Sequence, residues 1–97
     1  MTMGLDENII KSLINALSKY RQVSRAVIFG SRAQGNYKYN SDIDIAIYCD
    51  GNIPAQLYLE LDDAAGIFKI DVVDVGRLHN DVLLKNIEQK GIVFYSS

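Results

Sequence analysis

The chain has 97 residues, a length that holds one small domain with a single core. Hydrophobic residues make up 48% of the chain and the net charge is −2, which argues against the broad basic surface that binds a nucleic-acid backbone. No apolar run approaches the roughly 20 residues of a membrane span, and the first residues lack the pattern of a secretory signal. The single cysteine, Cys49, cannot form an internal disulfide and is expected to pack as a small hydrophobe. We therefore expect one cytoplasmic domain over residues 1–97, without a membrane segment or a polynucleotide substrate.

The first third of the chain predicts a helix, a strand and one helical turn. Residues 6–20 carry isoleucine and leucine at helical spacing, and Asp6 is a suitable N-cap. Residues 24–29 are a short apolar run that ends at a glycine, which is typical of a strand. Residues 31–34 are expected to form a single helical turn, followed by a polar surface loop at 35–41.

Residues 42–49 show the clearest strand pattern in the sequence. Isoleucines occupy every second position, and the positions between them hold two aspartates, an alanine and a tyrosine. The isoleucine face must meet the core, so the face with Asp42 and Asp44 is expected to be open.

The rest of the chain predicts two more helices and two more strands. A helix is expected to begin at Pro54 and end before Gly66, followed by a strand at 67–75. The last helix is expected to include Val82 on its apolar side and to end at Gly91. It should span residues 77–90, and the last strand 92–95. This order predicts an α/β (α+β) fold: a small mixed sheet with helices packed on one face and an open, acidic opposite face.

Two motifs lie where these elements meet, and together they suit a nucleoside triphosphate. Gly30 and Ser31 directly follow a strand, and such a turn offers backbone N–H groups to a phosphate. Asp42 and Asp44 share one strand face with Cα atoms about 6–7 Å apart, so their carboxylates can share one ion. Magnesium prefers hard oxygen ligands, and two ions together can neutralise a triphosphate and align the attacking oxygen. The pattern therefore predicts a triphosphate site with two Mg²⁺ ions.

A third carboxylate on a neighbouring strand would complete the site, and two aspartates compete for this role. Strand alternation places Asp71 on the open face and Asp74 on the core side, unless the strand has already ended. We expect Asp71 to be the third ligand and a base toward the incoming hydroxyl. Asp74 is expected to cap the following helix.

Other side chains near the motifs have weaker cases. Arg32 is the nearest cation for the triphosphate, but a solvated surface arginine fits the pattern equally well. Lys38 is a weaker candidate on the adjoining loop. Tyr37 and Tyr39 could stack on a base, although loop tyrosines are more often only part of the loop. His79 stands alone and is expected at the surface.

The spacing of these motifs resembles that of a known superfamily. Gly30-Ser31, ten further residues and Asp42-Ile43-Asp44 look like the motif of the DNA polymerase beta-like nucleotidyltransferases. The small size is similar to that of the minimal nucleotidyltransferases, the MNT domain proteins of bacteria and archaea. The likeness runs from residue 5 to residue 95.

This resemblance implies a polymerase beta palm-like fold and a function for each motif. Gly30 and Ser31 would contact the triphosphate of ATP or another nucleotide, and Asp42 and Asp44 would bind both Mg²⁺ ions. Asp71 would bind the catalytic ion. The sequence departs from many relatives in one respect, because Gln34 stands where they carry a second arginine. The grip on the triphosphate could therefore be weaker, though Arg32 is retained.

The resemblance also implies a partner. Minimal nucleotidyltransferases are typically encoded beside a small helical protein of the HEPN class, and several such pairs are toxin–antitoxin systems. In some of them the nucleotidyltransferase transfers AMP to a tyrosine of the HEPN toxin. A homodimer is the other expected way to cover the open pocket.

Three functions therefore compete at the level of sequence. The leading hypothesis is a Mg²⁺-dependent transfer of NMP, in particular AMP from ATP, to a hydroxyl of a partner protein. The alternative is a non-catalytic, nucleotide-binding antitoxin that neutralises a helical partner sterically. A resistance enzyme acting on a small alcohol is a weaker alternative, because those relatives are more than twice as long.

Overall fold

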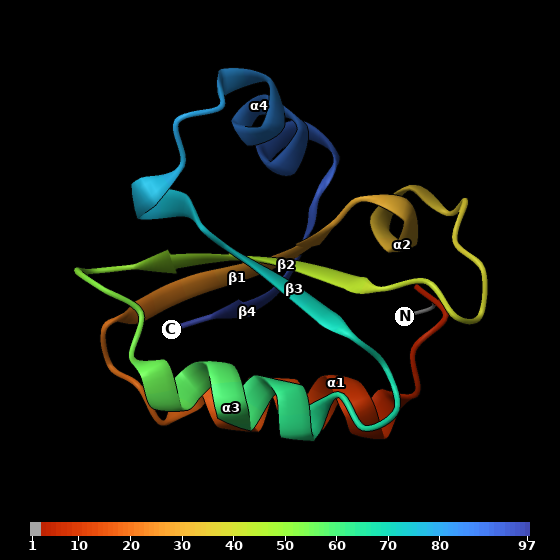
Figure 1. Cartoon of the computed structure of the whole chain (residues 1–97), viewed down its shortest axis with the longest axis horizontal. Helices are drawn as coiled ribbons and strands as arrows, with labels where there is room; N and C mark the ends of the chain where they lie inside the picture. Colours follow the sequence, from red (N-terminus) through yellow and green to blue (C-terminus); the bar gives the residue numbers. More distant parts are fainter. Residues whose placement is uncertain (1–2) are drawn as a thin grey trace.

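The computed structural model describes residues 3–97, in which four strands form one mixed sheet of order β3-β2-β1-β4 (Figure 1). The sequence predicts one domain over residues 1–97, of which residues 1 and 2 lie outside the part that the structure describes. The central strands β1 (Val23–Phe29) and β2 (Ile43–Cys49) run antiparallel. Strand β4 (Ile92–Ser96) pairs antiparallel with β1, and β3 (Ile70–Asp74) pairs parallel with β2. A parallel pair requires a crossover, and helix α3 (Ala55–Ala64) lies in the connection between β2 and β3.

Helices α1 (Glu7–Ser18) and α3 lie side by side beneath one face of the sheet (Figure 1). Helix α1 is capped as predicted, since the Asp6 carboxylate accepts a hydrogen bond of 2.7 Å from the Asn8 amide. Both helices pack a stripe of leucines against the sheet. The strand side chains that face these leucines include fully buried isoleucines. The main core includes Leu13, Leu17, Leu57, Leu61, Ile28, Ile43, Ile45 and Ile47. The alternation predicted for β2 is thus confirmed.

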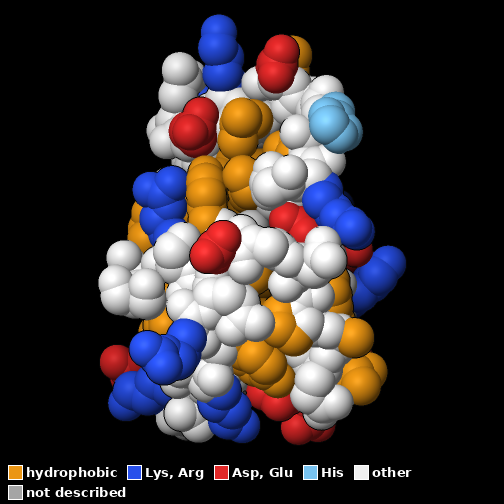
Figure 2. Space-filling view, turned by 90° about the vertical axis from the view of Figure 1, so that its left-hand side faces the viewer, with side chains coloured by type: hydrophobic (Ala, Val, Ile, Leu, Met, Phe, Trp, Pro, Cys, Tyr) orange, Lys and Arg blue, Asp and Glu red, His pale blue; other side chains and the backbone are white. Residues whose placement is uncertain are grey.

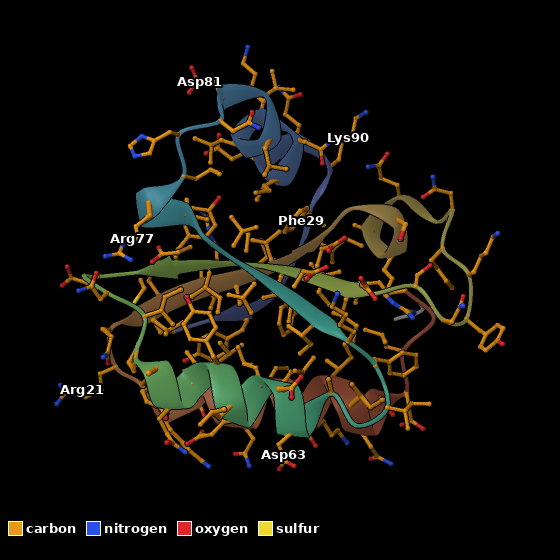
Figure 3. All side chains as sticks on the ribbon, in the orientation of Figure 1. Arg21, Phe29, Asp63, Arg77, Asp81 and Lys90 are labelled. Carbon is orange, nitrogen blue, oxygen red and sulfur yellow. The ribbon has the colours of Figure 1, made fainter. Side chains whose placement is uncertain are left out.

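Helix α4 (Asp81–Lys90) covers part of the opposite face, which differs from the expectation that all helices pack on one face. The mixed sheet with helices is confirmed, but β1 is apolar on both faces and therefore needs cover on both. Val27 and Phe29 form a second cluster with Ala46 of β2 and Ile87 of α4. Figure 2 shows hydrophobic side chains gathered between the sheet and α4 at the top, and Figure 3 shows Phe29 on this face.

The last helix begins later than the sequence pattern predicted. Strand β3 ends at Asp74, whose side chain caps a short 3₁₀ helix, η1 (Val75–Arg77). The backbone is extended again at Leu78, and Asn80 then caps α4 by accepting a hydrogen bond of 3.0 Å from the Leu83 amide. Val82, expected on the apolar side, lies in the first turn and is 81% exposed. None of the helices in residues 3–97 has the length and apolar character needed to span a membrane.

Candidate active site

Asp44 and Asp71 lie on the sheet face opposite α1 and α3, and Asp42 is near enough for its charge to act on Asp44. Asp44 lies in β2 and Asp71 in β3, and the parallel register places them directly side by side. Asp42 precedes the first residue of β2, two positions before Asp44. Adjacent strands are about 4.8 Å apart, so the sheet brings together carboxylates that are distant in sequence. The predicted alternation of β3 therefore holds around Asp71, which is exposed to solvent.

The electrostatics of Asp44 reflect this arrangement. Partial burial raises the pKa of the Asp44 carboxyl, and the negative charges of Asp71 and then Asp42 raise this pKa further. Like charges on neighbouring strands repel each other. The site therefore holds negative charge at a cost to the fold, which an added cation would offset.

Gly30 brings the Gly-Ser turn against the same carboxylate. Strand β1 ends at Phe29, directly opposite Asp44, and Gly30 follows with φ +74° and ψ −148°. A Cβ atom at Gly30 would lie 2.5 Å from the Asp44 Oδ2 atom, so both the conformation and the close approach require glycine. Helix α2 (Ser31–Gln34) begins immediately after it. The first amides of a helix lack a carbonyl partner within that helix.

The donor set suits a divalent cation in chemistry, although it is not preassembled. Within residues 3–97, no group of three or more His, Cys, Asp or Glu side chains is close enough to hold a metal ion as the side chains stand. Asp42, Asp44 and Asp71 nevertheless offer the hard oxygens that Mg²⁺ prefers. Their mutual repulsion, which contributes to the raised pKa of Asp44, is the property that a bound cation would relieve.

Asp74 is occupied by a structural role. Its carboxylate accepts a hydrogen bond of 3.1 Å from the Gly76 amide and so caps η1. In the sheet it pairs with Ile47 rather than with an aspartate. The geometry therefore places Asp71, and not Asp74, beside Asp44, as the sequence analysis expected.

The sequence analysis considered Arg32 either as a cation for the triphosphate or as a solvated surface residue, whereas the structure buries its side chain. The Arg32 side chain is only 2% exposed, and its guanidinium donates hydrogen bonds to backbone carbonyls, the shortest being 2.7 Å to the Ser41 oxygen. It lies 5.4 Å from the ring centroid of Tyr37 and 4.9 Å from that of Phe68. Because these carbonyls and rings surround it, the guanidinium is turned into the protein. Sequence reasoning missed this role, since nothing in the local pattern distinguishes a buried arginine from a surface one.

The other side chains considered in the sequence analysis lie in different environments. Tyr37 packs against Arg32, whereas Tyr39 is 87% exposed and its base-stacking role stays a prediction. Lys38 and His79 are both exposed. Burial, followed by nearby aspartate charges, raises the pKa of the Cys49 thiol, which opposes the formation of a thiolate nucleophile.

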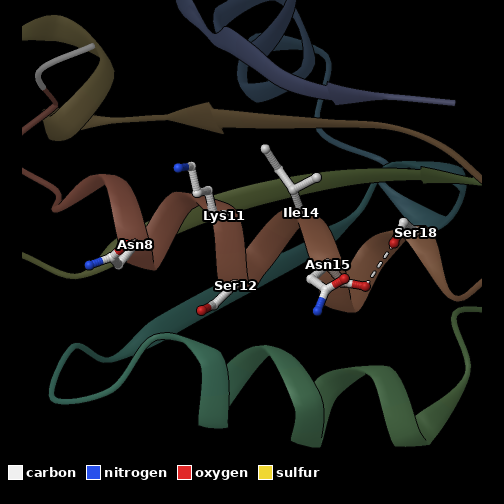
Figure 4. Close-up of a pocket in the computed structure, with 6 residues that line it drawn as sticks. All are labelled: Asn8, Lys11, Ser12, Ile14, Asn15 and Ser18. Atoms are coloured by element: carbon white, nitrogen blue, oxygen red, sulfur yellow. Dashed lines mark hydrogen bonds between the residues drawn. The ribbon is translucent and has the colours of Figure 1, made fainter.

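A large hollow elsewhere on the surface lacks this chemistry. It has a volume of about 460 Å³ and is lined by α1 alone (Figure 4). Its polar groups belong to one helix, where the Ser18 hydroxyl already donates a hydrogen bond of 2.8 Å to the Asn15 carbonyl. No carboxylate lines it, so we place the candidate site at the aspartates. The lining residues are Asn8, Lys11, Ser12, Ile14, Asn15 and Ser18.

Comparisons with known proteins identify the family of this chain. Residues 11–97 match the family described as Polymerase beta, Nucleotidyltransferase. A protein of Methanocaldococcus jannaschii, named as a protein adenylyltransferase, is 49% identical over 47 residues. That match covers 46% of this chain and 47% of the relative, so the chain spans about half the length of this curated relative.

Solved toxin–antitoxin structures share the fold. One, a toxin–antitoxin with AMP-PNP, has a TM-score of 0.73 at 27% sequence identity. The alignment covers 96% of this chain and 75% of the neighbour's chain. Another, a mutant of the toxin–antitoxin MntA–HpeT, has a TM-score of 0.72 at 25% identity with the same coverage. The family match extends over nearly the whole chain and includes the Gly-Ser turn and all three aspartates. The chain therefore belongs to the Polymerase beta nucleotidyltransferase family.

Proposed function

We propose that this chain is a Mg²⁺-dependent nucleotidyltransferase that transfers AMP from ATP to a hydroxyl group of a partner protein. The observation that carries the proposal is the pairing of Asp44 with Asp71 on adjacent strands, with Gly30 packed against Asp44. Support for adenylyl transfer to a protein comes from the name of the archaeal relative. Support for ATP comes from the AMP-PNP in a structural neighbour.

Each element of the site has a role in this reaction. Gly30 lets the backbone approach the triphosphate, and the amide and hydroxyl of Ser31 donate to a terminal phosphate oxygen. Asp42, Asp44 and Asp71 would hold two Mg²⁺ ions together with the substrate phosphates. When bound, these ions neutralise phosphate charge and supply Lewis-acid chemistry.

Asp71 is proposed to handle the proton of the acceptor. A carboxylate oxygen of Asp71 takes the proton of the attacking hydroxyl while the hydroxyl oxygen bonds to the α-phosphorus. The bond from the α-phosphorus to the bridging oxygen breaks, and pyrophosphate leaves with that electron pair. The exposure of Asp71 suits this role, because the acceptor must reach it from outside the chain.

The acceptor is proposed to be a small helical protein of the HEPN type, with this chain as its antitoxin. Three structural neighbours at 25% identity or more are toxin–antitoxin structures. The acidic end of the sheet is also accessible, because Asp71 is exposed and α4 covers the apolar cluster around Val27 and Ala46 instead. A second copy of the chain is the other candidate for covering this end.

Labelled ATP tests the reaction directly. The purified protein is incubated with Mg²⁺ and ATP labelled at the α- or the γ-phosphate, in an extract of its host. We expect transfer of the α label but not the γ label, loss of transfer with EDTA, and loss with Asp44→Asn. Asp63→Asn is the matched control, because Asp63 lies on the exposed face of α3 (Figure 3) and should transfer normally. Absence of transfer in the wild type, despite ATP binding, would contradict the proposal.

The same substitution separates an enzymatic antitoxin from a steric one. A steric antitoxin would neutralise its partner without any transfer of AMP. When the chain is co-expressed with its helical partner, Asp44→Asn should abolish neutralisation if transfer is required. Retained neutralisation, with the complex still formed, would favour the non-catalytic antitoxin.

A further inference from the structure

The buried Arg32 side chain connects the two motifs of the candidate site. Its own backbone follows Ser31 in α2, whereas its guanidinium reaches the loop that leads to Asp42. The Ser41 carbonyl accepts two hydrogen bonds from it, 2.7 Å from Nη2 and 3.2 Å from Nε, and the Tyr39 carbonyl accepts one of 3.4 Å. Ser41 is the residue before Asp42. One side chain thus fixes the position of the carboxylate motif relative to the Gly-Ser turn.

The opposite edge of the guanidinium holds the segment before α1. Nη1 donates to the Met3 carbonyl at 3.0 Å and to the Gly4 carbonyl at 3.3 Å. Gly4 has φ +66°, and a Cβ atom there would lie 2.9 Å from Arg32 Nη1 and collide with the Tyr37 ring. Arg32 and Tyr37 therefore fit tightly against a glycine of the N-terminal segment.

Two aromatic rings flank the guanidinium and extend the connection to β3. The Phe68 ring is 4.9 Å from Arg32 Cζ, and Phe68 lies just before the strand that carries Asp71. The neighbouring Lys69 carbonyl accepts a hydrogen bond of 2.8 Å from the Ile43 amide at the start of β2. The segments that present all three carboxylates thus meet around one buried cation.

A buried guanidinium is costly unless its donors are satisfied, and here all three nitrogens bond to carbonyl groups. Lysine cannot replace this arrangement, because an ammonium is a compact point charge without the planar fork of arginine. The same contacts turn Arg32 away from any bound triphosphate. We propose that Arg32 is the positioning residue of the site, which fixes the Gly30–Ser31 turn against Asp42 and Asp44. This inference rests on the proposed nucleotidyl transfer.

Kinetics of Arg32 variants distinguish positioning from direct phosphate binding. We expect Arg32→Met and Arg32→Lys to lower kcat for AMP transfer by about 100-fold, because small displacements of reacting groups have effects of this size. The KM for ATP should change by less than about threefold. Arg25→Met is the matched control: Arg25 also stacks on a tyrosine, 4.0 Å from the Tyr48 centroid, but lies four residues before Phe29 in β1. A raised KM with unchanged kcat, or no change in either, would overturn the proposal.

Amide hydrogen exchange provides a test that does not depend on catalysis. In the free protein, Arg32→Lys should increase exchange at least about tenfold in residues 38–43 and leave β4 unchanged. Gly4→Ala should act in the same direction, because its Cβ would displace the guanidinium. Gly66→Ala is the control, since Gly66 has φ +64° but nothing within 4 Å of its Cβ position.

The two readouts keep the proposals separable. An inactive wild type together with faster exchange in the Arg32→Lys variant would reject the proposed function. It would still support the role of Arg32 in holding these segments together. An active wild type whose Arg32→Lys variant shows unchanged exchange and unchanged kcat would reject the positioning role. If Arg32→Met fails to fold, Arg32→Lys and Gly4→Ala still decide the outcome.

Discussion

Gly30 joins the Gly-Ser turn to the carboxylates, because a side chain there would meet the Asp44 Oδ2 atom at 2.5 Å. We expect Gly30→Ala to lower AMP transfer by about 100-fold through displacement of Asp44. It should also lower the free energy of unfolding by about 1–3 kcal/mol, because the backbone conformation at Gly30 is essentially restricted to glycine. Label transfer and urea unfolding measure the two effects.

Gly51→Ala is the control for backbone strain. Gly51 has φ +83° with nothing within 4 Å of its Cβ position, so its substitution strains the backbone without touching the site. The Gly51→Ala substitution should lower the free energy of unfolding by about 1–2 kcal/mol and leave AMP transfer unchanged. Equal losses of activity in Gly30→Ala and Gly51→Ala would show that the contact with Asp44 has no role.

Asp44 gives a prediction about pH. Burial and the charges of Asp71 and Asp42 raise the pKa of Asp44 in the folded state, so the folded protein binds this proton more tightly than the unfolded chain. The ionised carboxylate therefore destabilises the fold above that pKa. Asp44→Asn should raise the free energy of unfolding at pH 7 in metal-free buffer, and the gain should shrink as the pH falls through the pKa of Asp44.

Urea unfolding at pH 7 and pH 4 measures the gain in the free energy of unfolding. Asp62→Asn, on the exposed face of α3, is the control and should change this free energy little. An Asp44→Asn variant that is less stable than the wild type at pH 7 would contradict the electrostatic account of the site. A gain at pH 7 together with lost transfer would show that the site sacrifices stability for function.

At the scale of elements, strict periodicity made most of the fold predictable from the sequence. The alternation of β2 and the leucine stripes of α1 and α3 depend on local spacing, and the structure confirms them. The start of α4 was not predictable in this way, because Leu78 and Val82 have helical spacing, whereas the structure has two separate helices here, capped by Asp74 and Asn80. The role of Arg32 depends on carbonyl groups and rings from three distant segments, which no local pattern displays.

The packing of α4 on the second face leads to a stability prediction. Ile87 is 1% exposed and contacts the cluster of Val27, Phe29 and Ala46. Ile87→Ala should lower the free energy of unfolding by about 2–5 kcal/mol because it leaves a cavity in this cluster. Val82→Ala on the same helix should change it by no more than about 0.5 kcal/mol, since Val82 is 81% exposed.

Urea unfolding of both variants checks this difference. Similar, small effects for Ile87→Ala and Val82→Ala would mean that α4 does not pack on the sheet as described.

At the scale of the whole molecule, one face of the sheet holds the main core and the other carries the candidate site. One face is closed by α1 and α3 and holds the main core (Figure 1). The other is closed over Val27 and Ala46 by α4, and beside this cluster it presents Asp44 and Asp71. The fold thus places a group of like charges beside the apolar cluster that α4 covers, and Asp71 of this group is exposed.

The most direct test of this account compares two aspartates of the same strand. Transfer of label from α-labelled ATP is measured for the wild type, Asp71→Asn and Asp74→Asn under identical conditions. We predict a loss of at least about 100-fold for Asp71→Asn. Asp74→Asn should remain near wild type, because asparagine can still accept the hydrogen bond that caps η1. Normal transfer by Asp71→Asn, or loss confined to Asp74→Asn, would contradict the proposed site.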